Sequence, residues 1–168
     1  EVAALMLPEV HPGDARPAVL AAGYGRAPWA RCPVRMVDPD GPREVLAVGA
    51  DIKAVEAENI HFTLKFLGEI PQSTVNEVIS CMDKLDFNSF AVEITGVGCF
   101  PNIRNPRVVW VGLSTGLDAF SRLSKQLDDY LRGIGFKSEG ERFTAHLTIG
   151  RVRSGRNKAA LIKKLGEL

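Results

Sequence analysis

The sequence is poor in cysteine, in net charge and in long apolar runs, and each shortage excludes a class of protein. Its three cysteines, Cys32, Cys81 and Cys99, are odd in number and form no closely spaced pair. This argues against a disulfide framework and favours a reducing compartment, so we expect a cytoplasmic protein. The formal net charge is only +1, so any nucleic acid must bind at a local patch and not through the whole surface. No apolar run is long enough to cross a bilayer, and no signal peptide is evident.

The first fifty residues differ in composition from the rest of the chain. They contain no Ser, Thr, Asn, Gln, Lys, Ile or Phe, and they carry seven of the ten prolines. Such a composition argues against a regular sheet or long helices. We therefore expect residues 1–49 to be an atypical segment rich in Pro, Gly and Arg. It would be disordered, or mis-assigned and read from a foreign frame, with an RNA-contacting tail as the alternative. Residues 50–168 would form the folded domain.

From residue 51 onward the hydrophobic pattern alternates between strand and helix. Strands are predicted over 59–67, 90–100, 107–113 and 143–152, and helices over 73–86, over 117–132 and from about 156 onward. Turn residues rich in Gly and Pro separate these segments. The pattern of a strand followed by a helix occurs twice, at corresponding places in two halves. The sequence therefore predicts an α+β fold with a weak internal repeat.

The tetrapeptide pattern His-x-Thr-x also occurs twice, as HFTL at 61–64 and HLTI at 146–149. Alternate side chains of a strand share a face, so each copy would present an imidazole beside a hydroxyl, with the apolar residues toward a core. Two imidazoles can supply a base and an acid near neutral pH, and two hydroxyls can hold phosphoryl oxygens. A single strand histidine is more often a surface or packed residue, but two matched copies favour acid–base chemistry on a phosphate ester.

The runs that carry these motifs resemble a known family. NIHFTLKFLGEI at 59–70, followed by FTAHLTIGRV at 143–152, is similar to the 2H phosphoesterase superfamily and, more narrowly, to its RNA 2′,3′-cyclic phosphodiesterases, also called 2′-5′ RNA ligases. The resemblance covers about residues 50–168. It implies a bilobed α+β fold in which two antiparallel sheets flank a central cleft, with helices outside.

The same resemblance implies an activity and its partners. Family members hydrolyse RNA 2′,3′-cyclic phosphate ends to 2′-phosphomonoesters, and some also join tRNA halves reversibly through a 2′-5′ linkage. They need no metal and no other cofactor. We therefore expect a metal-independent enzyme that acts on RNA ends, tRNA halves among them, works as a monomer and has no membrane partner.

Residue roles follow from the resemblance as well. His61 would be the proton donor to the leaving 3′ oxygen, and His146 would be the proton acceptor that activates water. Thr63 and Thr148 would donate hydrogen bonds to the non-bridging phosphate oxygens and stabilise the charge that builds on them. Arg151 would hold the phosphate through its guanidinium.

The position of Arg151 raises a question of parity. It lies five residues after His146, so an ideal strand would turn its side chain to the opposite face. A β-bulge at Gly150 would return Arg151 to the cleft; otherwise it is a rim or surface residue.

Three further residues have two interpretations each. Lys65 shares the face of His61 and either contacts RNA phosphate or is solvated. Phe100 and Trp110 are candidates for stacking a base, although core packing is the stronger interpretation for Trp110.

The chain departs from the family pattern at both ends. Family members begin with a short apolar strand and continue beyond the second motif into further strands, and neither piece is recognisable here. We therefore expect a C-terminally truncated domain with exposed sheet edges. Two alternatives to the enzyme stay open. One is a non-catalytic nucleotide- or RNA-binding 2H module, and the other is an inactive fragment.

Overall fold

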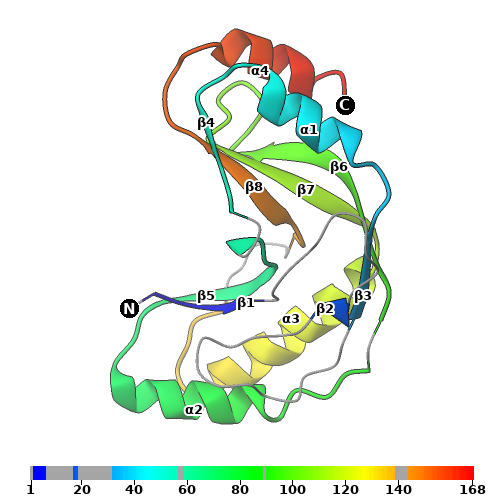
Figure 1. Ribbon diagram of the computed structural model, residues 1–168. Coiled ribbons are helices and arrows are strands. Elements are labelled where there is room, and N and C mark those ends of the chain that lie inside the picture. Colours follow the sequence, from blue (N-terminus) through cyan, green and yellow to red (C-terminus); the bar gives the residue numbers. More distant parts are fainter. Residues whose placement is uncertain (1, 7–16, 19–31, 57–58, 89, 139–143) are drawn as a thin grey trace.

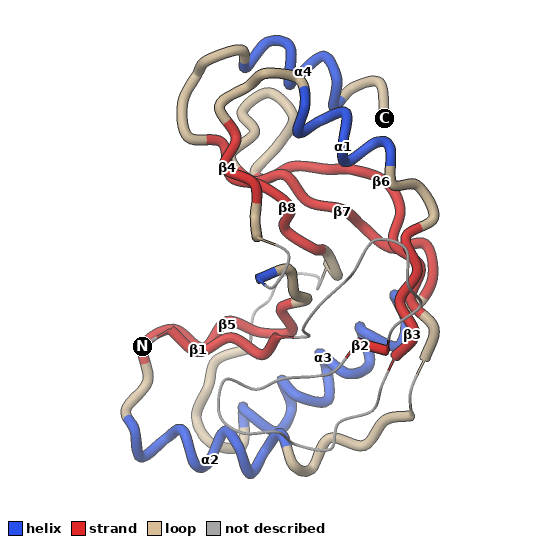
Figure 2. Tube along the Cα trace, viewed as in Figure 1, coloured by secondary structure: helices blue, strands red, loops and turns tan. Residues whose placement is uncertain are grey.

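The computed structural model describes residues 2–6, 17–18, 32–56, 59–88, 90–138 and 144–168. Two lobes face each other and are joined along one side, so that the chain has the outline of a letter C (Figure 1). Figure 2 shows β5 and β8 toward the inside of this outline, with α1 and α4 outside the upper lobe and α2 outside the lower lobe. Among the described residues, no helix is long and apolar enough to cross a membrane.

A six-stranded sheet forms the upper lobe and extends down the side that joins the two lobes (Figure 1). Its order is β2 (Pro17–Ala18), β3 (Cys32–Met36), β6 (Val92–Phe100), β7 (Val108–Thr115), β8 (Leu147–Val152) and β4 (Ile52–Ala54). Helices α1 (Asp40–Ala47) and α4 (Lys158–Leu165) cover its outer face (Figure 1). Val45 and Leu161 from these helices are fully buried, as are Val109 and Val111 of β7. The opposite, inner face of the sheet faces the lower lobe.

The lower lobe pairs β1 (Val2–Met6) with β5 (Thr63–Glu69) in antiparallel fashion, beside α2 (Gln72–Met82) and α3 (Leu117–Arg132). Helix α3 is amphipathic, because its buried residues recur every three or four positions and so form one stripe: Phe120, Leu123, Leu127 and Leu131. The Phe120 ring lies 4.6 Å from the ring of Phe62, centroid to centroid. This contact fixes the start of β5, and with it the first His-x-Thr motif, against α3.

The predicted α+β fold is confirmed, with two differences of detail. The lower sheet has two described strands, and the β3–β6 pair of the upper sheet is parallel, where antiparallel sheets were expected. The predicted boundary at residue 49 stays a prediction. Within the segment before it, however, α1 is a regular helix that buries Val45 in the core.

Candidate active site

The two His-x-Thr motifs meet where the lobes touch. An isolated antiparallel bridge pairs Phe62 with Leu147, the residues that directly follow His61 and His146. Because the paired segments run in opposite directions, this bridge sets each histidine beside the threonine of the other motif. Diagonal neighbours across such a pair lie about 7–8 Å apart. The fold therefore brings both imidazoles and both hydroxyls to one small area, related by a local two-fold axis.

The alternation predicted for the motifs is present in the structure. Phe62 and Leu64 are buried in the core, as are Leu147 and Ile149 of the second motif, whereas both histidines and both threonines remain partly exposed. One detail differs from the prediction, because both histidines lie outside the strands: His61 is two residues before β5, which begins at Thr63, and His146 directly precedes β8, which begins at Leu147.

The same backbone contact fixes both imidazole rings. The Nδ1 atom of His61 lies 2.6 Å from the carbonyl oxygen of Asn59, and Nδ1 of His146 lies 2.7 Å from the carbonyl oxygen of Thr144. A carbonyl oxygen only accepts, so each Nδ1 carries a proton and donates it. Each Nε2 is thereby left for a substrate, in a ring whose orientation is already set.

Thr63 and His146 open into a cleft of about 830 Å³, a volume suited to a nucleotide-sized ligand. His61, Thr148 and Arg151 do not line this hollow. Its second wall is one side of α3, which contributes Asp118, Ser121, Ser124, Lys125, Asp128, Asp129 and Arg132. The two motifs thus lie at the border between the cleft and the inner face of the upper sheet.

Aromatic rings surround the second histidine. The centroid of the Phe100 ring lies 4.9 Å from that of His146, edge to face, and the Trp110 ring lies 6.0 Å from it. Trp110 pairs with Thr148 across β7 and β8, so its side chain is on the inner face and not in the helix-covered core. Its ring lies over Gly98, where an added Cβ atom would come within 2.3 Å of it. Phe100 also lines the cleft, whereas Trp110 does not line it and its indole nitrogen is buried.

Strand β8 contains a bulge beside Gly150, one of the two outcomes considered for Arg151. In the pairing with β7, Val109 faces Gly150 while the next residue, Trp110, faces Thr148, so Ile149 is the extra residue. Beyond the bulge Arg151 pairs with Val108, which lies two residues from Trp110 and thus on the same face.

The neighbours of Gly150 support this placement. An added Cβ atom at Gly150 would lie 2.6 Å from Ile52 and 3.2 Å from Leu46 of α1, so Gly150 faces the helix layer. Arg151, the next residue, is exposed on the inner face with both motifs.

Lys65 takes neither of the roles considered from the sequence. Only 7% of it is exposed, and its Nζ atom makes an ion pair with Asp128 of α3 and donates to the carbonyl oxygen of Lys137 at 3.1 Å. Burial by itself raises the pKa of Asp128, but hydrogen bonds from Lys65 and Ser138 and the charges of Lys65 and Arg132 outweigh it and hold this pKa below its usual value. The lysine therefore ties β5 to α3.

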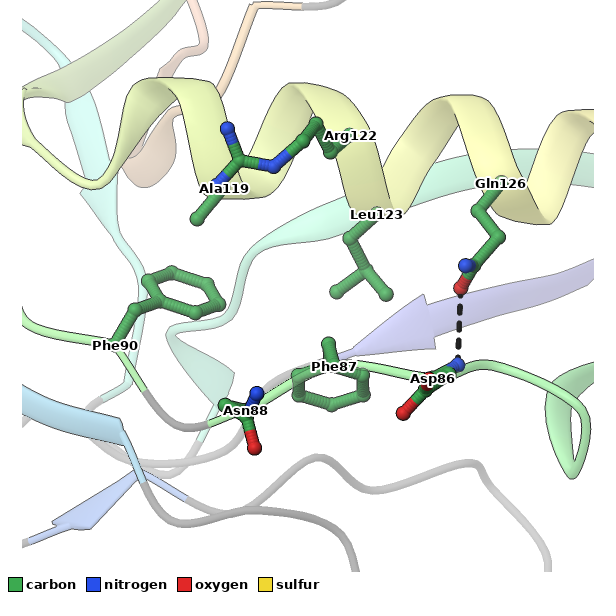
Figure 3. Close-up of a pocket in the computed structure, with 8 residues that line it drawn as sticks. All are labelled: Asp86, Phe87, Asn88, Phe90, Ala119, Arg122, Leu123 and Gln126. Carbon is green, nitrogen blue, oxygen red and sulfur yellow. Dashed lines mark hydrogen bonds between the residues drawn. The ribbon is translucent and has the colours of Figure 1, made fainter.

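A second hollow of about 370 Å³ lies between the loop before β6 and α3. Figure 3 shows Phe87, Phe90 and Leu123 around it, with the backbone N–H of Asp86 donating to Gln126 at 3.0 Å. No residue of either motif lines it, and we assign it no part in the chemistry. Within the described part of the chain, no group of three or more His, Cys, Asp or Glu side chains is placed to hold a metal ion.

Sequence reasoning missed Asn59 and Thr144 as the residues that orient the histidines. Both act through a backbone carbonyl two residues before the histidine, so their side-chain types carry no signal. Asp128 was missed as well, because its partner Lys65 lies 63 positions away in the sequence.

The chain is similar in sequence to known proteins. The family model described as LigT like Phosphoesterase matches residues 43–110. The RNA 2′,3′-cyclic phosphodiesterase of Aeropyrum pernix is 37% identical over 120 residues, which cover 71% of this chain and 68% of the relative. That of Methanothermobacter thermautotrophicus is 40% identical over 121 residues, covering 71% and 65%. The chain thus spans about two thirds of the length of these relatives.

Two solved structures share the fold. The E. coli LigT protein, complexed with 3′-AMP, superposes with a TM-score of 0.54 at 17% identity, over 92% of this chain and 76% of that one. A protein of Thermus thermophilus gives a TM-score of 0.54 at 20% identity, over 70% and 71%. The matched family, the curated relatives and the two paired His-x-Thr motifs agree, and the chain belongs to the LigT-like phosphoesterases of the 2H superfamily.

Proposed function

We propose that this protein hydrolyses RNA 2′,3′-cyclic phosphate ends to 2′-phosphomonoesters. The observation that carries the proposal is the meeting of the two His-x-Thr motifs at the Phe62–Leu147 bridge, with each Nδ1 bonded to a backbone carbonyl. In this arrangement two oriented Nε2 atoms can act on the same phosphate. Acid–base opening of a cyclic ester needs one group that accepts a proton and one that donates a proton. The curated relatives named RNA 2′,3′-cyclic phosphodiesterase support the same reaction class.

In the proposed reaction the two histidines start in different protonation states. Neutral His146 accepts a proton from water through Nε2 as the water oxygen attacks phosphorus. The bond from phosphorus to the 3′ oxygen breaks, and protonated His61 gives its Nε2 proton to that oxygen. The product is a 2′-phosphomonoester with a free 3′-hydroxyl, and one proton has moved from His61 to His146 through the substrate and water. Exchange with solvent restores both rings.

The remaining site residues stabilise the phosphate during this step. Thr63 and Thr148 lie beside the opposite motif's histidine, so their hydroxyls can donate to the two non-bridging oxygens as negative charge builds on them. Arg151, returned to the inner face by the bulge in β8, adds a cationic fork. An RNA 5′-hydroxyl in place of water would give a 2′-5′ linkage, so ligation of RNA ends such as tRNA halves is a side reaction of the same site.

Hydrolysis of a short RNA that ends in a 2′,3′-cyclic phosphate tests the proposal, with the product phosphate assigned by phosphorus NMR. We expect a 2′-phosphomonoester only. A 3′-phosphate product would contradict the assigned roles. Binding of AMP without turnover, by a sample that melts cooperatively, would instead indicate a nucleotide-binding module. The absence of a cooperative melt would indicate an inactive fragment.

A further inference from the structure

A second cation lies beside Arg151 on the inner face of the upper sheet. Strand β4 is the edge strand next to β8, and Lys53 is the direct antiparallel partner of Arg151. Directly opposed residues of an antiparallel pair point to the same face. Ile52 and Ala54, the neighbours of Lys53, pair with Val152 and Gly150, and Gly150 faces the helix layer. Lys53 therefore shares the face of Arg151 and of the two His-x-Thr motifs.

No described carboxylate neutralises these two cations. Lys53 and Arg151 are both exposed, and neither makes an ion pair with a described residue. Like charges directly opposite each other in a sheet are destabilising, so an anion between or beside them would relieve the repulsion.

The opposite wall of the cleft has a different charge pattern. On α3 the cations Lys125 and Arg132 are both paired with Asp129, and Asp128 is paired with Lys65. The described cations that line the cleft, Lys65, Lys125 and Arg132, are thus all paired, unlike Lys53 and Arg151.

The covalent structure of the substrate indicates which phosphate would lie near Lys53. A 2′,3′-cyclic phosphate is the 3′ end of an RNA, so the next phosphate lies on the 5′ side of the terminal nucleoside. Lys53 lies one strand spacing of about 5 Å from Arg151, on the same edge of β8 as the Phe62–Leu147 bridge, and a lysine reaches with a flexible four-carbon side chain. We propose that Lys53 binds the phosphate 5′ to the terminal nucleoside and so favours RNA ends over mononucleoside cyclic phosphates. This inference rests on the proposed function.

The test compares two substrates in one variant. The unaltered chain and Lys53→Gln are assayed on a diadenosine dinucleotide that ends in a 2′,3′-cyclic phosphate and on adenosine 2′,3′-cyclic phosphate, which lacks the 5′ phosphate. We expect Lys53→Gln to lower the ratio of the two kcat/KM values about fivefold, as loss of one phosphate contact should. For the dinucleotide, log kcat/KM decreases with log salt concentration, and in Lys53→Gln this slope should become shallower by about 0.7. In Lys53→Arg both the kcat/KM ratio and the salt slope should return most of the way to the values of the unaltered chain.

Lys84→Gln is the matched control, since Lys84 is an exposed lysine that follows α2 in the other lobe, and it should leave the ratio unchanged. An equal effect of Lys53→Gln on both substrates, or no effect on either, would overturn the inference. Equilibrium binding of the two 2′-phosphate products gives the same ratio without turnover. A chain that binds both products but hydrolyses neither substrate would contradict the proposed function alone, and the binding ratio would still decide the role of Lys53.

Discussion

The buried ion pair between Lys65 and Asp128 predicts a specific loss of stability when the carboxylate is removed. In Asp128→Asn the ammonium group of Lys65 keeps one described hydrogen bond, to the carbonyl oxygen of Lys137 at 3.1 Å, and has no counter-charge. Removing one partner of a fully buried pair costs about 3–5 kcal/mol. Because 20% of the Asp128 side chain is exposed, solvent offsets part of this, and we expect a loss of about 2–3 kcal/mol.

For a chain of this size, that loss should lower the melting temperature by roughly 5–10 °C. Urea denaturation with an unchanged m-value is the measurement. Asp129→Asn is the control, because Asp129 is the next residue and its pairs with Lys125 and Arg132 lie on the surface of the same helix. That variant should melt close to the unaltered chain. The double variant Lys65→Met/Asp128→Asn should lose less free energy of unfolding than the two single variants lose together, and the difference should be at least about 1 kcal/mol.

The pKa of Asp128 sets the pH dependence of this difference. Since its folded-state pKa is held below the usual value, the carboxylate adds stability that is fully present above the ordinary aspartate pKa of about 3.9 and is lost as pH falls through the folded pKa. The gap between the unaltered chain and Asp128→Asn should thus be constant from about pH 6 to 8 and close in stronger acid. If the two proteins are equally stable at neutral pH, or if the gap widens in acid, the pair does not act as we infer.

Three further predictions concern the site and its surroundings. Gly98→Val should lower kcat/KM at least about tenfold and change the fluorescence of Trp110, because the new side chain would occupy the space of that ring; unchanged values would mean that the ring is not needed. Gly150→Val should cost about 1–3 kcal/mol in urea denaturation through its clash with Ile52 and Leu46, and a neutral effect would contradict the bulge. Turnover should be the same with and without EDTA, so a chelator-sensitive rate would point to a metal ion.

The sequence was informative where a local pattern determines the chemistry. The two His-x-Thr motifs predicted a phosphoesterase site, and alternation within each motif correctly placed Phe62 and Leu147 in the core. The parity of Arg151 left two outcomes open, a bulge at Gly150 or a rim position, and the structure contains a bulge one residue earlier, at Ile149. In each case a few consecutive residues carry the whole signal. The catalytic and binding roles of these residues remain predictions.

The sequence was misleading where distant residues decide the outcome. Lys65 has the pattern of a solvated strand residue, and only its encounter with Asp128 makes burial tolerable. The parallel pairing of β3 with β6 joins segments 58 residues apart at Val34 and Val92, a separation that no local pattern encodes. Composition alone argued against regular structure before residue 50, yet α1 forms because Val45 can be buried against the sheet.

The activity of His61→Ala and His146→Ala tests the central claim most directly. If one imidazole gives a proton and the other accepts one, each variant should lose at least about 10²-fold in kcat on a cyclic phosphate end. The double variant should be little worse than either single one, since the two groups act in one step. Both variants should keep the urea midpoint of the unaltered chain, because both rings are partly exposed. A folded variant of either histidine that retains full activity would contradict the two-histidine mechanism.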